Sequence, residues 1–156
     1  MTVSSAGSVD TLQGTLRDCT PQGKGLARLH AGDIAFVDAP DISRRLAETL
    51  AAAKPTAVVN LARFSTGAIP NYGPHLLLDA GVPLYEAAGS ELRSKIRDGK
   101  KARVSPEGEI TVGRKVVGHA TAVTREDIDT TFADAQRGLV DNMEAFFGNT
   151  IQFIHS

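Results

Sequence analysis

The polar residues best suited to bind a ligand lie just after a short, apolar predicted strand near the middle of the chain. Asn60 ends the apolar run 56–60, and Arg63, Ser65 and Thr66 follow it. In open α/β sheets, ligands sit at the carboxyl ends of the strands. A guanidinium beside two hydroxyls can hold an anion through charge-assisted hydrogen bonds. A solvated arginine among turn residues explains the same stretch, so both interpretations stay open.

A second polar group stands at the start of the next helix. Asn71, Tyr72 and Gly73 precede Pro74, which suits a first helical position because proline lacks an N–H that would go unsatisfied there. Asn71 or Gly73 is expected to cap this helix. The sequence therefore predicts a cleft for a small ligand between these residues and the 60–67 loop.

Other combinations of polar residues give weaker evidence for a catalytic or metal site. Asp33 and Asp38 flank a strand and are able to do acid–base work as a pair, but turn formation and helix capping explain both more simply. The histidines are scattered without the paired spacing of metal ligands, at His30, His75, His119 and His155. The sequence predicts no catalytic residue, no metal and no cofactor.

Composition narrows the class of protein. The chain has 156 residues, of which 42% are hydrophobic and 22% charged, as in one globular domain with room for an arm. A formal net charge of −1 gives no field that would gather nucleic acid, so no nucleic-acid partner is predicted. Cys19 is the one cysteine, which indicates a cytoplasmic address. No apolar run approaches the roughly 20 residues of a membrane span, so direct membrane insertion is not expected.

Periodicity predicts an α/β domain with a mixed sheet over residues 11–124, preceded by a mobile arm at residues 1–10. Buried runs at 34–37 and 56–60 enclose an amphipathic helix, which indicates a parallel crossover. The expected strands are 11–19, 34–37, 56–60, 82–85, 101–105, 109–112 and 114–124. The expected helices are 41–53 with Asp41 as N-cap, 74–80, and 90–97 with Ser90 as cap.

A long helix is predicted from residue 125 onward. Thr124 begins a segment that resembles a capping box, and a run of about 28 helical residues would be about 42 Å long. Its apolar residues recur at mostly helical spacing, with Phe147 off the main stripe; those expected to mediate an interaction are Ile128, Phe132, Leu139, Met143, Phe146, Phe147 and Ile151. Gly138 and Gly148 weaken the interior of this helix, so the sequence allows a break near Gly148. Two interpretations stay open: the helix packs on its own sheet, or it docks on a second copy, another domain or a partner.

The order of segments resembles a known architecture. The residues that carry the likeness are Gly32-Asp33-Ile34, Ala57-Val58-Val59, Gly81-Val82-Pro83 and the run from Ala102 to Ile110. They are similar to the swivelling phosphohistidine domain of phosphoenolpyruvate-utilising enzymes, and the resemblance implies a β/β/α sandwich. That family places its reactive histidine at a spacing which, counted back from Gly81, reaches Tyr72 rather than His75. We therefore expect His75 to be a structural or surface residue.

A resemblance over nearly the whole chain is carried by five stretches, Gly32-Asp33-Ile34-Ala35, residues 53–60, Pro70-Asn71-Tyr72-Gly73-Pro74, residues 80–84, and Glu144-Ala145-Phe146 with Asn149-Thr150. These look like the amino-terminal part of the SteA family of actinobacterial cytokinetic-ring proteins. The resemblance implies a role in cell division and the cell envelope, together with a SteB-like membrane partner. The family's longer members continue into a thiamin-pyrophosphokinase-like region, which this chain of 156 residues stops short of.

Two classes of function follow. The first is a non-catalytic division-associated module, expected to form a homodimer through its long helix and to work in the cytoplasm at the septum. The alternative is a phosphate-handling enzyme, phosphocarrier or small-molecule sensor that binds a phosphorylated ligand near the 60–75 loops.

Overall fold

The computed structural model describes residues 10–155, with side chains described through residue 147. The predicted arm at residues 1–10 therefore lies almost wholly outside the described residues. The strands are β1 (Leu12–Asp18), β2 (Ile34–Val37), β3 (Ala57–Asn60), β4 (Leu84–Glu86), β5 (Lys101–Val104), β6 (Glu109–Val112), β7 (Lys115–His119) and β8 (Thr121–Val123). The helices are α1 (Arg44–Ala53), α2 (Gly73–Asp79) and α3 (Arg125–His155), with 3₁₀ turns η1 (Gly25–Arg28) and η2 (Ser90–Lys95).

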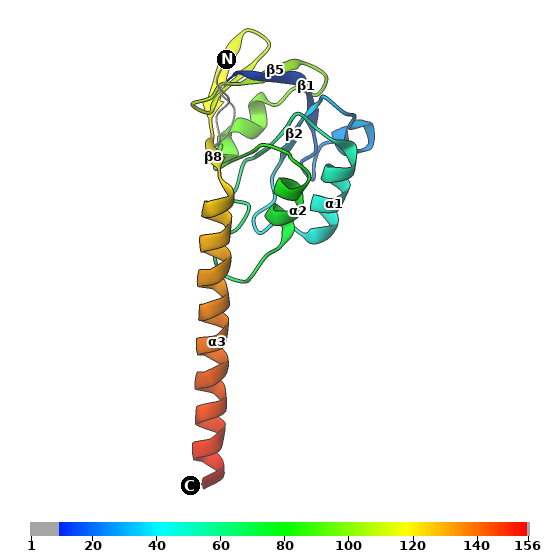
Figure 1. Cartoon of the computed structure of the whole chain (residues 1–156). Helices are drawn as coiled ribbons and strands as arrows, with labels where there is room; N and C mark the ends of the chain where they lie inside the picture. Colours follow the sequence, from blue (N-terminus) through cyan, green and yellow to red (C-terminus); the bar gives the residue numbers. More distant parts are fainter. Residues whose placement is uncertain (1–9, 156) are drawn as a thin grey trace.

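A single mixed sheet organises the domain (Figure 1). Its strand order is β7-β6-β5-β1-β2-β3-β4-β8. The four strands from β1 to β4 are parallel to one another, and antiparallel strands extend the sheet at both ends. The parallel pairing of β2 with β3 confirms the crossover that the sequence predicts through α1.

The sheet curls strongly. β7 and β8 stand at opposite ends of the strand order, yet Ala120 alone separates them in the chain. Ala120 is buried and donates its N–H to the oxygen of Gly108 at 2.8 Å. A Cβ at Gly108 would lie 1.9 Å from the Ala120 oxygen, and its φ of +93° is unfavourable for other residues, so glycine is required there. Ala120 is thus held against the β6–β7 hairpin at one end of the strand order, and the chain continues from it into β8 at the other end.

Two apolar cores result, one on each face of the parallel strands. One core lies inside the curl, where Phe36, Tyr85 and Ile110 meet under Leu92 of η2. The other lies between the parallel strands and the two helices α1 and α2, around Phe64. The layers are therefore helices, parallel strands and curled antiparallel strands. The predicted α/β class, with its mixed sheet and long C-terminal helix, is confirmed.

The helix α3 begins where the sequence predicts it. Thr124 and Asp127 form a reciprocal capping box, in which the Thr124 N–H donates to Asp127 Oδ2 at 3.2 Å and the Asp127 N–H donates to Thr124 Oγ1 at 3.1 Å. The helix continues for 31 residues without a break at Gly148 and runs well beyond the domain (Figure 1).

Three local predictions are wrong. Asp41 does not cap α1, because it adopts a left-handed φ of 50° and turns its carboxylate to Thr66, while Ser43 Oγ accepts the Leu46 N–H at 3.1 Å as the N-cap. The expected helix at 90–97 is a 3₁₀ turn that begins at Ser90 itself. The expected strand at 114–124 is two strands, since β7 pairs with β6 and β8 pairs with β4.

Candidate functional site

The loop between β3 and α2 leaves the carboxyl end of a parallel strand, as the sequence predicts for the candidate site. Asn60, the last residue of β3, is fully buried. Its Oδ1 accepts the N–H groups of Ala39 and Ala62, and its Nδ2 donates to the Ala39 oxygen, each at 3.0 Å. The Asn60 amide therefore ties the end of β2 to the end of β3.

Thr66 is held in the same way by Asp41. The Thr66 N–H donates to Asp41 Oδ1 at 2.8 Å, and its hydroxyl donates to Asp41 Oδ2 at 2.7 Å. The Asp41 N–H donates in turn to the Arg63 oxygen at 3.3 Å. These bonds fix the turn after β2 against the loop after β3, and they use the hydroxyl that the sequence offers to an anion.

Asn71 closes the loop onto the start of α2. Its Nδ2 donates to the Phe64 oxygen at 2.9 Å and to Ser65 Oγ at 3.3 Å, while its Oδ1 accepts the Gly73 N–H at 3.0 Å. Asn71 thus makes a capping hydrogen bond, although the residue at the N-cap position is Tyr72. A Cβ at Gly73 would lie 2.5 Å from the Ile42 oxygen, so this buried position admits only glycine.

Arg63 is the one charged residue among the seven candidate ligand-binding residues. Its side chain is 54% exposed, and its Nε lies 4.0 Å from Glu86 Oε2. Arg63 and Ser65 line a cleft of about 470 Å³, which the carboxylates of Glu86, Glu126 and Asp127 also line. One arginine facing three carboxylates gives little attraction for a phosphate. Anion binding by the seven candidate residues stays a prediction that this lining does not favour.

Tyr72 and His75 form an aromatic contact with the terminal helix instead of facing the loop. The Tyr72 ring centroid lies 4.5 Å from that of Phe132 and 5.6 Å from that of His75, and the His75 and Phe132 rings meet edge to face at 5.3 Å. His75 Nε2 lies 2.9 Å from Asp129 Oδ1. An Arg125–Asp79 ion pair at 2.9 Å adds to the same contact. His75 therefore anchors α3 on α2.

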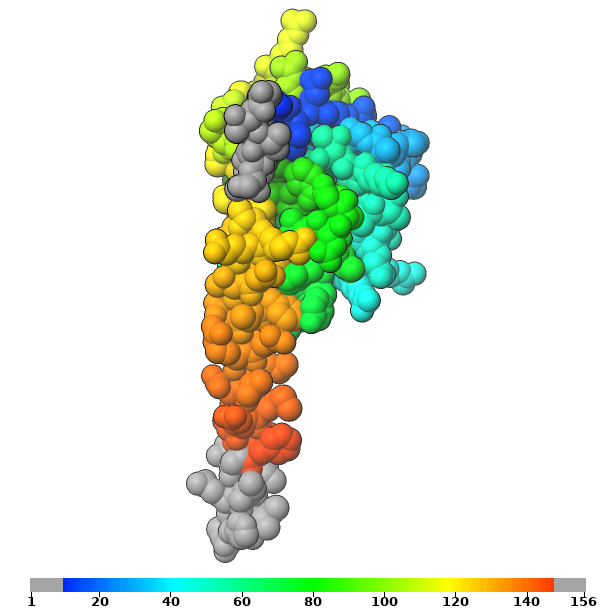
Figure 2. Space-filling view, viewed as in Figure 1, coloured from blue at the N-terminus to red at the C-terminus, as the bar shows by residue number. Residues whose placement is uncertain are grey.

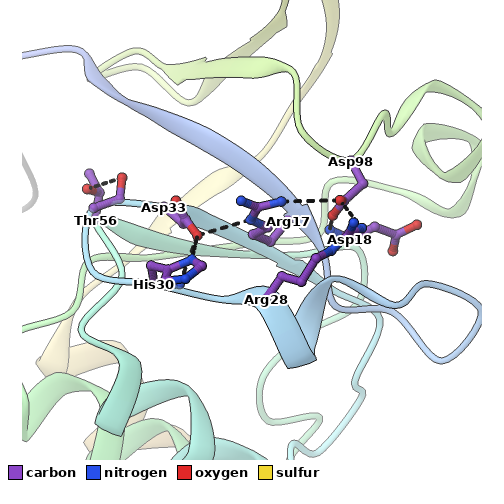
Figure 3. A network of polar contacts seen from close by, with 8 residues as sticks. Arg17, Asp18, Arg28, His30, Asp33, Thr56 and Asp98 are labelled. Atoms are coloured by element: carbon purple, nitrogen blue, oxygen red, sulfur yellow. Dashed lines mark hydrogen bonds and ion pairs between the residues drawn. The ribbon is translucent and has the colours of Figure 1, made fainter.

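A separate polar network joins β1 to two distant loops (Figure 3). Arg17 Nε donates to Asp33 Oδ2 at 3.1 Å, and Arg17 Nη1 donates to Asp98 Oδ2 at 3.4 Å. Asp98 also accepts a hydrogen bond from the Asp18 N–H at 2.8 Å and another from the guanidinium of Arg28. The hydrogen bond with Asp33 raises the pKa of Arg17. Because its carboxylates bind arginines and backbone N–H groups of the same chain, this network serves to tie the loops together.

Asp33 and Asp38 do not act as the carboxylate pair that the sequence analysis gave as the less simple interpretation. Asp33 belongs to the network around Arg17, whereas Asp38 pairs with Arg93 beyond the other end of β2. These two carboxylates are thus unable to share a proton or a substrate.

Cys19 is buried at 7% exposure just after β1. Burial, with further contributions from Asp18, Asp98 and Asp33, raises the pKa of its thiol from 9.0 to about 12. A thiol with this pKa is a poor nucleophile at neutral pH, because almost none of it is thiolate.

The Cys19 pKa gives a test by pH. Above pH 9 the thiol of the unfolded chain loses its proton while the folded thiol keeps it, so the unfolded state is stabilised as pH rises toward 12. Urea unfolding at several pH values from 8 to 11 should show a fall in the free energy of unfolding that is steeper for the native chain than for Cys19→Ala. Equal slopes in the two proteins would show that the folded thiol titrates normally.

Two further features are absent from the part of the chain that the structure describes. No group of three or more histidine, cysteine or acidic side chains in it could hold a metal ion. None of the helices in this part of the chain has the length and apolar character to cross a bilayer. Comparison with known proteins is also without a match, since no family model and no curated protein is similar to the chain.

Proposed function

We propose that this chain is a non-catalytic interaction module that forms a homodimer through the part of α3 beyond the domain. The observation that carries this proposal is a continuous apolar face on α3 that extends beyond the part of the helix in contact with the domain. By its resemblance to the SteA family, the module acts in bacterial cell division and envelope integrity.

The apolar face begins as a packed surface. Ile128 and Ala135 are each 3% exposed, and Phe132 contacts Tyr72 and His75. Farther along α3 the large apolar side chains are between 47% and 66% exposed, and these are Leu139, Val140, Met143, Phe146 and Phe147. At about 100° per residue all five fall within an arc of about 120° that also contains Phe132. The same face that binds the domain thus continues into solvent. Figure 2 shows the part of α3 that projects beyond the domain.

An exposed helix of this composition needs a partner. Residues 137–155 would form a helix of about 28 Å, and isolated helices of this length are marginal in water even when rich in alanine. Gly138 lowers helix stability by about a further 1 kcal/mol relative to alanine. Helix formation here is therefore favoured by packing of the apolar face.

A second copy of the chain suits this face. A two-fold dimer lets one apolar face meet itself, which needs no other partner chemistry. With on the order of 100 Å² to bury for each of five side chains in each copy, the contact supplies about 1,000 Å², close to the lower limit of a stable interface. The spacing of Ile128, Phe132, Ala135 and Leu139 is four, three and four, which Met143 and Phe146 continue. An eleven-residue repeat of this kind favours nearly straight or slightly right-handed helix pairs.

The non-catalytic part of the proposal is supported by the candidate loops. The side chains of Asn60, Thr66 and Asn71 form hydrogen bonds with the backbone and side chains of neighbouring loops. His75 faces Asp129 and Phe132. These groups stabilise the fold without offering a nucleophile or an oxyanion site.

The cellular setting rests on the resemblance alone. It places the module in the cytoplasm at the division septum, where a dimer would present two domains to a SteB-like membrane partner. Fluorescent tagging of the full chain in an actinobacterial host would test this setting, with a diffuse signal in dividing cells as the contrary result.

Truncation tests the proposed interface. A chain ending at Gln136 keeps Ile128, Phe132 and Ala135, which pack on the domain. We expect light scattering to give twice the chain mass for residues 1–156 and the monomer mass for residues 1–136. The thermal midpoint of the domain should change little, because the removed residues lie beyond those contacts. Equal oligomeric states for the two chains would remove the proposal.

A further inference from the structure

A second cleft, of about 610 Å³, lies between the turn after η2 and the β6–β7 hairpin. It shares no lining residue with the acidic cleft near Arg63 or with α3. Half of its ten lining residues are basic, and none is acidic. The basic residues are Lys95, Arg97, Lys100, Arg114 and Lys115.

This clustering is not a consequence of the overall charge. The whole chain has 17 basic and 18 acidic residues, so five cations around one cleft stand out against a balanced background. Within residues 10–147, none of the five has a carboxylate within 4.0 Å. The nearest acid in sequence, Asp98, is occupied by Arg17 and Arg28. The positive charge of the cleft is therefore left for an external anion.

Among the described residues, hydrogen bonds to the backbone hold the side chain of Arg97 in place. Its Nη1 donates to the backbone oxygens of Ser94 at 3.0 Å and of Ile96 at 3.4 Å. These bonds hold one side of the guanidinium, while Nε and Nη2 have no hydrogen-bond partner among the described residues. A guanidinium fixed in this way loses less conformational entropy when it binds a phosphate.

The cleft also has an apolar part. Val112 is 9% exposed at its wall, Val117 is partly buried, and Val116 beside them is 61% exposed. Apolar surface with a few convergent polar groups is typical of small-molecule sites, whose volumes are about 300–1,000 Å³. A cation-lined cleft with an apolar wall suits a ligand that has both phosphates and an organic body.

From these observations we infer that the cleft between η2 and the β6–β7 hairpin binds a small molecule carrying two or more phosphates. Arg97 and Lys100 contact the phosphates from one side, Arg114 and Lys115 contact them from the hairpin, and the valines contact the organic body. This inference is independent of the dimer proposed above, since α3 contributes no residue to the cleft.

Calorimetric titration of the full chain with tripolyphosphate and with ADP tests the site. We expect one saturable site per chain for each probe, with ADP the tighter of the two because its nucleoside contacts the valines. The triple substitution Arg97→Gln, Lys100→Gln and Lys115→Gln should weaken binding of both probes at least tenfold. A matched triple, Lys24→Gln, Arg44→Gln and Arg45→Gln, removes the same charge from exposed positions elsewhere and should leave binding unchanged.

A double variant, Arg114→Gln and Lys115→Gln, guards against a folding defect because both residues are exposed in the hairpin. It too should weaken binding without altering the circular dichroism spectrum. Absence of saturable binding at millimolar probe, or equal loss in the matched triple, would overturn the inference. So would co-sedimentation with phosphatidylglycerol vesicles in the absence of any binding to the soluble probes, because the source of phosphate would then be a lipid surface.

Discussion

Replacing Leu139 and Met143 by aspartate is expected to convert the proposed dimer into a monomer. These side chains are 47% and 50% exposed on the isolated chain and lie in the middle of the apolar face of α3. Losing the burial of two large apolar side chains in each of two copies removes about 6 kcal/mol or more. That loss raises the dissociation constant by a factor of about 10⁴, which analytical ultracentrifugation at micromolar concentration would detect as a complete shift to monomer.

The matched control places the same two charges outside the apolar arc. Asn142→Asp with Ala145→Asp adds identical charge to the same turns of α3, and this variant should remain dimeric. Dissociation of both variants would indicate a general charge effect on the helix. Persistence of the dimer in the Leu139 and Met143 variant would place the interface elsewhere.

Removal of the Asn60 side-chain amide should lower the free energy of unfolding more than any other substitution proposed for the domain. Asn60→Ala deletes three hydrogen bonds of 3.0 Å from a side chain with no solvent exposure. Each bond contributes about 1 kcal/mol, and the Ala39 and Ala62 groups left behind add to the cost, so the free energy of unfolding should fall by about 3 kcal/mol. Urea unfolding monitored by circular dichroism measures this change.

The same substitution at an exposed asparagine provides the comparison. Asn142→Ala on α3 should alter domain stability by less than about 0.5 kcal/mol, the usual range for surface positions. A fall in the free energy of unfolding of less than about 1 kcal/mol for Asn60→Ala would show that its amide is dispensable for stability. That result would favour the prediction of Asn60 as a ligand-binding residue.

Features encoded within a few residues were predictable from the sequence. The strands at 34–37 and 109–112 have the predicted bounds, since a short buried run and a regular alternation are local signals. The capping box at Thr124 and a long helix after it were likewise visible in the sequence, and the observed helix has 31 residues where about 28 were predicted. In each case the residues that determine the element lie inside it or beside it.

Features set by distant pairing were missed. The division of residues 114–124 into two strands depends on β6 and β4, and on the close approach of Gly108 to Ala120. Asp41 has the residue type of an N-cap, but its bonds to Thr66, which is 25 residues away, determine its conformation. Local propensity does not contain this information.

The candidate site illustrates the same division. The position of the 60–73 loops was predicted, yet the engagement of their polar groups with one another was not. The basic cleft was missed although its cations come from two segments that the pairing of β5 with β6 brings together. The pairs Lys100-Lys101 and Arg114-Lys115 carried a signal in the form of adjacent charges at both ends of a predicted hairpin.

The mass of the unmodified chain in solution tests the central claim most directly. Sedimentation equilibrium at micromolar concentration, in which shape does not affect the result, should give about 33 kDa, or twice the 16.5 kDa of one chain. A mass of 16.5 kDa maintained over the whole concentration range would contradict the proposed dimer and leave the apolar face of α3 without its second copy.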